Sequence, residues 1–261
     1  MKTWRFSGGA AGRTSGRPAG SFAVILCAIG LAACSGSSAL PEPAILATVD
    51  CVRPEDPGPL FALDRFDASI AGFETSDRAN PQEPGGVVFT GSSSMVFWQS
   101  AGADMAPLPI INRGFGGSVI PQATHYASRI IHPYEPRAVV LYSGDNDVGF
   151  GGSPDCVLED LRLFRDEVRR QDADLPIYVL AIKPSFARAV LWEQMEHANE
   201  LMAALASTDR QMTFIDVATP MFLPGGELNP DLFVADGLHM SPEGYALWTS
   251  IVRPILHDDL L

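Results

Sequence analysis

Short apolar runs alternate with longer segments of helical periodicity along most of this chain. In the longer segments, apolar residues recur every three or four positions, which is typical of helices that bury one face. The short runs are rich in Val, Ile, Leu and Phe, as in strands that are buried on both sides. The expected strands are 87–90, 108–112, 138–142, 177–182 and 212–217. The expected helices are 60–78, 118–131, 154–171, 189–207 and 241–256.

This order of elements predicts an α/β fold. Strands that alternate with helices of this length form a parallel sheet whose two faces are covered by helices. We therefore expect a three-layer α/β/α sandwich with a central, mainly parallel five-stranded sheet. The chain shows no internal repeat and no second domain, so this fold is expected over residues 60–261.

The first 34 residues have the pattern of a secretory signal. A basic start precedes an apolar run over residues 22–33, which is shorter than the stretch of about 20 apolar residues that a membrane-spanning helix needs. The run ends in Leu31-Ala32-Ala33-Cys34, which resembles the cleavage box of bacterial lipoproteins. That resemblance implies a lipid-modified Cys34 at the mature N-terminus of an exported, membrane-anchored protein, in the periplasm or the outer cell envelope. Ordinary secretion, with Cys34 inside the cleaved segment, is the alternative.

Residues 35–59 are rich in Ser, Pro and Gly, and we predict a flexible tether between the lipid and the domain. The whole chain has 18 Lys and Arg against 31 Asp and Glu, a net charge of −13. Removal of the signal makes the chain more acidic still, because it takes away Lys2, Arg5, Arg13 and Arg17. Such a surface repels nucleic acid and anionic membranes, so the expected membrane contact is the N-terminal lipid only.

Two of the four cysteines, Cys51 and Cys156, are left once Cys27 of the signal and the lipid-modified Cys34 are set aside. An oxidising compartment favours a disulfide between them, but the sequence leaves this open because it does not show that they are close. The chain has no Cys-x-x-Cys pair, and four of its histidines are scattered, at positions 125, 132, 197 and 257. No metal site is therefore expected.

Polar or glycine-rich loops follow the first three expected strands. Gly91 and the serines 92–94 follow the first strand, Gly116-Gly117 lies in the loop after the second, and Asp145-Asn146-Asp147 follows the third. Because the carboxyl ends of parallel strands meet at one edge of a sheet, where α/β proteins bind ligands, the three loops are candidates for one site. Each loop taken alone has ordinary turn composition.

Two familiar binding motifs are excluded at these loops. The glycine loop lacks the third glycine of a dinucleotide fingerprint, because position 119 is Val. The Asp-Asn-Asp stretch lacks the spacing and the closing Glu of an EF-hand calcium loop.

A fourth polar signal, Asp236-Gly237-Leu238-His239, precedes the last expected helix. At this spacing the carboxylate of Asp236 can accept a hydrogen bond from the imidazole of His239, which leaves the other ring nitrogen free to act as a base. A pair of this kind is also common at helix starts.

The four signals together resemble the sequence blocks of the SGNH hydrolase superfamily, also called GDSL esterases and lipases, over about residues 87–248. The resemblance implies a flavodoxin-like α/β/α fold. It also implies the roles of five residues: Ser93 as nucleophile, Asp236 and His239 as its supporting pair, and Gly117 and Asn146, with the N–H of Ser93, as oxyanion donors.

One position departs from the family pattern. Ser92 stands where the commoner motif has Asp. Because Ser92 and Ser94 flank Ser93, the choice among the three hydroxyls rests on the alignment of the motif alone.

The resemblance implies a serine-dependent ester hydrolase that works through an acyl-enzyme and needs no cofactor and no metal. The expected substrate is a small-molecule or carbohydrate ester, with an acetylated carbohydrate suggested by the exported location. An acyltransferase with the same triad and a non-catalytic, glycan-binding surface lipoprotein are the alternatives. Four aromatic residues near the expected site loops are candidates for substrate contact, although core packing is expected for at least half of them: Trp98, Phe115, Phe150 and Trp192.

Overall fold

The structure is a computed structural model that describes residues 50–54 and 58–261. The predicted signal peptide, Cys34 and most of the predicted tether lie outside these residues. Among the described residues, no helix is long and apolar enough to cross a membrane.

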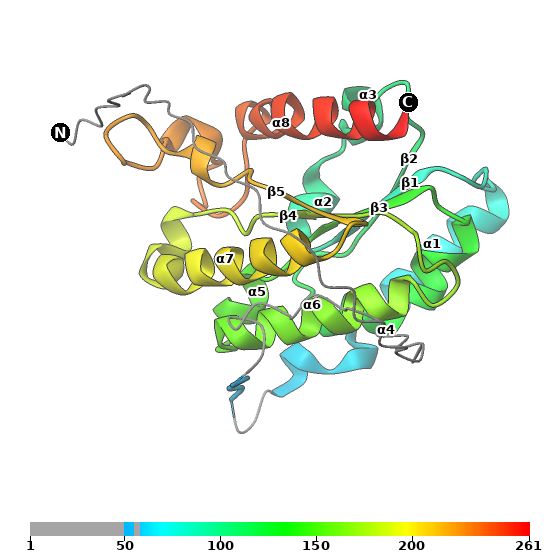
Figure 1. The fold of residues 1–261 in the computed structure, drawn as a ribbon, viewed down its shortest axis with the longest axis horizontal. Helices are drawn as coiled ribbons and strands as arrows, with labels where there is room; N and C mark the ends of the chain where they lie inside the picture. Colours follow the sequence, from blue (N-terminus) through cyan, green and yellow to red (C-terminus); the bar gives the residue numbers. More distant parts are fainter. Residues whose placement is uncertain (1–49, 55–57) are drawn as a thin grey trace, which may run out of the picture. The chain divides into compact units, whose positions relative to one another are not determined.

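Five parallel strands form the central sheet (Figure 1). The strands are β1 (Val87–Gly91), β2 (Ile110–Gly114), β3 (Ala138–Tyr142), β4 (Ile177–Leu180) and β5 (Met212–Ile215). Their order is β2-β1-β3-β4-β5, and each neighbouring pair is parallel. This confirms the predicted sheet, and the order is that of flavodoxin-like folds.

Helices cover both faces of the sheet, which confirms the three-layer arrangement (Figure 1). The first face carries α1 (Asp67–Ala79), α4 (Ile120–Ile130), α6 (Pro154–Val168) and α7 (Trp192–Thr208). The second face carries α3 (Ala101–Asp104) and α8 (Pro242–Leu260).

The strands contribute alternate side chains to two cores. In β3, Val139 and Leu141 pack into the core of the first face, and Val140 and Tyr142 into that of the second. Successive side chains of a strand point to opposite faces of the sheet. Because both faces are buried here, the strand is a continuous apolar run in the sequence.

The expected strand at 108–112 lies two residues further along the chain. The N–H of Leu108 donates to the carbonyl of Met105 over 3.0 Å, which closes a turn. The chain therefore joins the sheet only at Ile110, which pairs with Val87.

The expected helix at 60–78 is wrong in its first part. Two 3₁₀ turns, η2 (Gly58–Phe61) and η3 (Leu63–Phe66), precede α1. The side-chain amide of Gln122 donates to the carbonyls of Leu60, at 3.0 Å, and Ala62, at 2.8 Å. These carbonyls point to a neighbouring helix instead of accepting bonds within a continuous α-helix.

Short helical segments stand where the sequence predicts polar loops after the first and third strands, and the first residues of the helix expected at 189–207 belong to a 3₁₀ segment. The chain forms α2 (Ser93–Phe97) and α5 (Asp145–Gly149) directly after β1 and β3, and a 3₁₀ segment, η5 (Phe186–Leu191), precedes α7. Asp and Asn are poor helix formers, so the polar sequence of α5 predicts a turn. Its first three residues are buried, and contacts with other elements decide its conformation.

Part of the predicted tether lies on the domain. Cys51 is joined to Cys156 of α6 by a disulfide, with the Cα atoms 4.4 Å apart. The N–H of Val52 donates to the hydroxyl of Ser153 over 3.1 Å, and the side chains of Arg53 and Asp160 form an ion pair at 2.5 Å. Residues 51–53 are therefore fixed against the first turns of α6, so the predicted flexibility does not extend to them.

Candidate active site

Ser93 lies just beyond the carboxyl end of β1, the strand between β2 and β3 in the sheet. Gly91 has φ of 123°, and a Cβ atom there would come within 1.9 Å of the carbonyl oxygen of Tyr142. Only glycine therefore fits this approach of β1 to β3. Ser93 then begins α2, where its own N–H is not used by the hydrogen bonds of the helix.

A chain of hydrogen bonds joins Ser93 to His239 and His239 to Asp236. His239 lies 146 residues after Ser93 in the sequence. The Ser93 Oγ lies 3.0 Å from His239 Nε2, and His239 Nδ1 lies 2.6 Å from Asp236 Oδ2. A proton on Nδ1 is donated to the carboxylate, which leaves Nε2 to accept the hydroxyl proton.

The carboxylate of Asp236 is fixed by its own loop. Its Oδ1 accepts from the backbone N–H groups of Leu238, at 2.8 Å, and His239, at 2.9 Å. The hydrogen bond from the His239 ring, followed by those from the two backbone N–H groups, lowers the pKa of Asp236 to about 2. The Asp-x-x-His spacing thus allows one short loop to hold both partners.

The structure distinguishes among the three serines. The side chain of Ser92 is completely buried, and its hydroxyl faces Asp145 Oδ1 at 3.5 Å. Ser94 is also buried, at 2 % exposure, and its carbonyl accepts from the hydroxyl of Tyr245. Of the three hydroxyls, the one of Ser93 faces the imidazole.

The predicted oxyanion residues lie in the loops on either side of β1. Gly116 is close to Ser93, because a Cβ atom on it would lie 3.6 Å from the Cβ of Ser93. Gly117 has φ of 80°, which favours glycine. The side-chain amide of Asn146, at the start of α5, donates to the carbonyl of Ser118 over 2.9 Å and so connects the two loops.

Two basic residues that the sequence did not suggest support these groups from the segment between β4 and α7. Arg188 Nη2 donates to Asn146 Oδ1 over 2.7 Å, and Nη1 lies 3.0 Å from Asp145 Oδ2. The buried Lys183 donates to the carbonyl of Leu238 over 2.6 Å. Burial lowers the pKa of Lys183 to about 8, against the opposing charge of Asp145. No sequence motif marks either residue.

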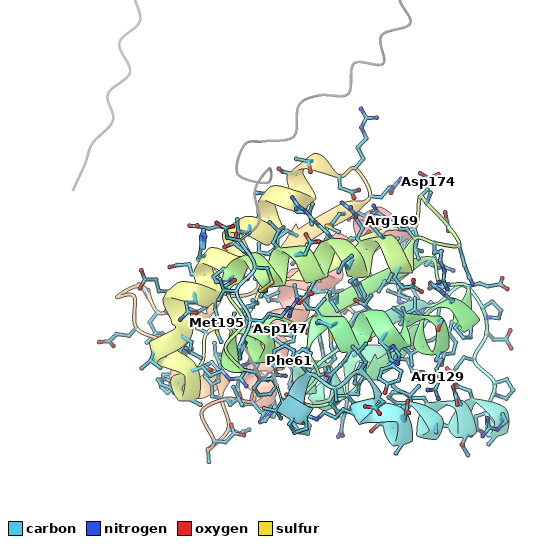
Figure 2. The ribbon with its side chains drawn as sticks, turned by 90° about the horizontal axis from the view of Figure 1, so that it is seen from below. Phe61, Arg129, Asp147, Arg169, Asp174 and Met195 are labelled. Carbon is cyan, nitrogen blue, oxygen red and sulfur yellow. A yellow bond between two sulfur atoms is a disulfide. The ribbon has the colours of Figure 1, made fainter. Side chains whose placement is uncertain are left out.

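Asp147 is a buried carboxyl group close to these loops. Its Oδ1 accepts from the N–H of Ile120, at the start of α4, over 2.9 Å. Within the described part of the chain its Oδ2 is buried without a hydrogen-bond partner. Figure 2 shows Asp147 inside the domain, away from its outline. Burial raises the pKa of Asp147 to about 7, although the bond from Ile120 opposes this shift.

The raised pKa makes stability depend on pH. In the unfolded chain this carboxyl loses its proton near pH 4, whereas in the folded protein it keeps the proton to about pH 7. Stability therefore falls as pH rises through this window, by up to about 1.4 kcal/mol per pH unit. We expect Asp147→Asn to raise the melting temperature at pH 8 and to change it little at pH 4, measured by thermal unfolding.

The matched control for Asp147→Asn is Asp258→Asn, which removes the same charge from an exposed position of α8. It should change the melting temperature only slightly at either pH. An equal effect of the two substitutions at pH 8 would contradict the buried, protonated state of Asp147.

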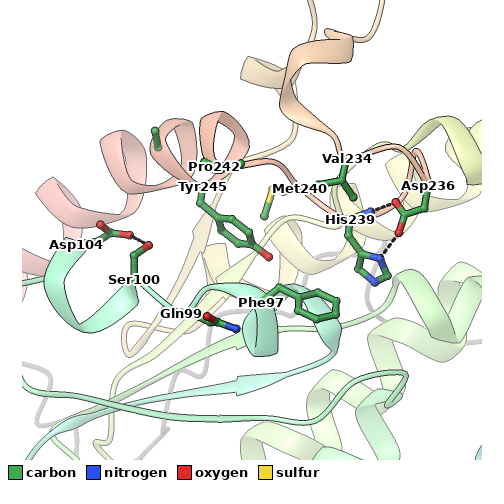
Figure 3. A pocket seen from close by; sticks show the side chains of 11 residues that line it. Phe97, Gln99, Ser100, Asp104, Val234, Asp236, His239, Met240, Pro242 and Tyr245 are labelled. Carbon is green, nitrogen blue, oxygen red and sulfur yellow. Dashed lines mark hydrogen bonds and ion pairs between the residues drawn. The ribbon is translucent and has the colours of Figure 1, made fainter.

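A pocket of about 610 Å³ adjoins His239 (Figure 3). It lies between the end of α2, the residues around α3 and the start of α8. The ring of Phe97 meets that of His239 edge to face, with the centroids 4.8 Å apart. The lining residues are Phe97, Gln99, Ser100, Asp104, Val234, Asp236, His239, Met240, Pro242, Tyr245 and Ala246.

The four aromatic residues proposed for substrate contact do not line this pocket. Trp98 and Phe115 are buried in the cores of the second and first faces. Phe150 packs against Phe61, and Trp192 packs against Phe222. The pocket instead contains Phe97 and Tyr245, because α2 and the start of α8 face each other here.

The described residues contain no group of three or more His, Cys, Asp or Glu side chains that could hold a metal ion.

Sequence comparison decides the family. Residues 79–247 match the family model of GDSL-like lipases and acylhydrolases. The chain belongs to this family. Its family makes the protein a carboxylic ester hydrolase, and all five residues with predicted catalytic or oxyanion roles lie inside the matched range.

Solved structures similar to this GDSL-like hydrolase share its fold. A protein from Streptococcus pneumonia, provisionally described as a platelet activating factor, has 22% identity and a TM-score of 0.66, over 74% of this chain and 94% of its own. A provisionally assigned acylhydrolase from Bacteroides fragilis has 21% identity and a TM-score of 0.62, over 77% and 98% of the two chains. A family 3 carbohydrate esterase from Clostridium thermocellum has 17% identity and a TM-score of 0.53, over 67% and 98%. A search among curated proteins found no match.

Proposed function

We propose that this ester hydrolase works through an acyl-enzyme on Ser93. The observation that carries the proposal is the continuous hydrogen-bonded chain from Ser93 through His239 to Asp236. The Asp236 carboxylate holds the imidazole in the tautomer whose Nε2 accepts a proton, and it stabilises the imidazolium that forms.

The proposed reaction has two halves. In the first, Ser93 Oγ bonds to the ester carbonyl carbon while its proton moves to His239 Nε2, and the tetrahedral intermediate then expels the alcohol with that proton. In the second, water gives a proton to His239 and attacks the acyl group, and the Ser93 oxygen takes the proton back as the acid leaves. The N–H groups of Ser93 and Gly117 and the amide of Asn146 are the proposed donors to the oxyanion of both intermediates.

A fluorophosphonate probe tests the nucleophile directly. The probe should label the full chain at a single residue, and peptide mapping should place the label on Ser93. Free acid should remain the main product of p-nitrophenyl acetate when an acceptor sugar is in excess, since a hydrolase uses water. Absence of label, or a label on Ser92 or Ser94, would be incompatible with this mechanism.

We propose an acetylated carbohydrate as the substrate class, among the small-molecule and carbohydrate esters that the family allows. The similarity in fold to the Clostridium thermocellum carbohydrate esterase supports this class. A long-chain lipid is disfavoured, because the sequence has no large apolar insertion that would form a lid.

We further propose that the enzyme is exported and anchored in the cell envelope by a lipid on Cys34. The support is the basic start, the apolar run and the Leu-Ala-Ala-Cys box at residues 31–34. The wild-type chain should take up labelled palmitate and sediment with membranes, whereas Cys34→Ala should do neither. Membrane association of Cys34→Ala without label would point to another anchor.

A further inference from the structure

The pocket beside His239 and the proposed oxyanion donors lie on different sides of Ser93. The lining includes His239 but not Ser93, Gly117 or Asn146. The pocket is built by residues that precede and begin α8 and by residues around α3, on the second face of the sheet. The carbonyl of Gly117 accepts from Arg65 of η3, which contacts α4, and Asn146 lies in α5, which contacts α6.

The path of the proton in the proposed reaction determines which part of a bound ester lies next to His239. When the first intermediate collapses, the bond between the carbonyl carbon and the alcohol oxygen breaks, and the proton on Nε2 moves to that oxygen. The alcohol oxygen must therefore be within hydrogen-bond reach of Nε2, while the oxyanion faces the donors on the other side. The rest of the alcohol continues past the imidazole toward the pocket.

We propose that this pocket binds the alcohol part of the ester, and that this part is an uncharged, hydroxylated ring of sugar size. The proposal rests on the proposed acyl-enzyme mechanism and on the proposed carbohydrate substrate, and it adds to them the place where the leaving alcohol binds.

The lining suits a molecule with apolar faces and hydroxyl groups. Figure 3 shows the rings of Phe97 and Tyr245 between His239 at one end and Asp104 with Ser100 at the other. Aromatic rings provide apolar surface for the C–H face of a sugar. Such a ring would lie against Phe97, which is 46% exposed.

The far end of the pocket provides hydrogen-bond partners for hydroxyl groups. Asp104 Oδ2 accepts from the hydroxyl of Ser100, at 2.6 Å, and from the indole N–H of Trp98, at 2.7 Å. These bonds fix the carboxylate, and among the described residues its Oδ1 has no hydrogen bond. The exposed side chain of Gln99 lies in the same lining and can donate and accept.

Charge excludes anionic alcohols from this pocket. Its lining contains two carboxylates, Asp104 and Asp236, and no Lys or Arg. A phosphate or carboxylate on the leaving group would meet these like charges without a compensating cation. The expected leaving group is therefore uncharged, which favours a sugar over a phosphorylated headgroup.

Acetates that differ only in their alcohol test the proposal. With the full chain in detergent, kcat/KM for a mono-acetylated methyl xyloside should exceed that for ethyl acetate by about tenfold or more. Phe97→Ala and Gln99→Leu should each reduce this ratio by about fivefold or more. Leu163→Ala, at an exposed position of α6, is the control and should keep the wild-type ratio. The phosphate of 1-acetylglycerol 3-phosphate should lower kcat/KM about tenfold relative to 1-acetylglycerol.

A second series keeps the alcohol constant and varies the acyl chain. The ratio of activity on p-nitrophenyl butyrate to that on p-nitrophenyl acetate should be the same in wild type and Phe97→Ala. A change in this ratio, with an unchanged ratio of xyloside to ethyl acetate, would show that the pocket holds the acyl chain and would overturn the proposal. An active wild type that treats both acetates alike would also overturn it. Failure of the proposed mechanism itself would look different: no ester would be cleaved and no fluorophosphonate label would form.

Discussion

Replacing Ser93 with alanine is expected to lower kcat for p-nitrophenyl acetate by at least about 10⁴-fold. The substitution removes the oxygen that lies 3.0 Å from His239 Nε2, so no acyl-enzyme can form. Ser93 is only partly buried, and its hydroxyl is hydrogen-bonded to His239, so circular dichroism and the melting temperature should change little. Release of p-nitrophenol measures the loss.

The flanking serines give matched controls. Ser92→Ala and Ser94→Ala remove the same atom from adjacent buried positions, whereas the hydroxyl bonded to His239 is that of Ser93. Both variants should keep kcat within about tenfold of wild type, since neither loses the nucleophile. A loss of activity in Ser92→Ala together with retained activity in Ser93→Ala would move the nucleophile.

Asn146→Asp is expected to lower kcat by roughly 10²- to 10³-fold with a small change in KM. The carboxylate has the shape of the amide and can still accept from Arg188, but it has no N–H to donate. Its negative charge would also face the oxyanion, which exists only in the intermediates, so the effect falls on kcat. Steady-state kinetics across several ester substrates measures it, and a change confined to KM would argue against an oxyanion role.

Arg188 provides a test of how the amide of Asn146 is oriented. Its hydrogen bond to Oδ1 fixes which end of the amide points away from the arginine. Arg188→Met should lower kcat about tenfold in the wild-type background, an effect of the size usual for coupling between contacting residues. In the Asn146→Asp background the same substitution should lower kcat much less. Additive effects in the double variant would show that Arg188 acts on the fold in general and not through Asn146.

Much of the fold could be predicted because it depends on local patterns. The strand at 138–142 is apolar at every position, and its two-sided burial in the structure is the reason. The last helix was expected from 241, and α8 begins at Pro242 with Ser241 as its N-cap, whose hydroxyl accepts from the N–H of Gly244. Local patterns failed at α5, where the buried contacts of polar residues outweigh their preference for turns.

The candidate site was predictable to a different extent in each of its parts. Asp236 and His239 are three residues apart, so their hydrogen bond depends on one short loop that the sequence itself encodes. The sequence offers three adjacent serine hydroxyls as candidates for the nucleophile, and the resemblance of the motif to the family indicates the middle one. No sequence signal separates Phe97, which is exposed, from its neighbour Trp98, which the core buries.

By itself, then, the sequence determined the parallel sheet, the two helical layers and the family, because strand periodicity and short motifs are properties of neighbouring residues. Only the tertiary structure decided which hydroxyl faces the imidazole across 146 positions and that Arg188 reaches Asn146 across 42. It also decided that Cys51 meets Cys156 and that a pocket opens beside His239. These features depend on distances between segments that only the packed sheet and helices bring together, and no local pattern encodes such distances.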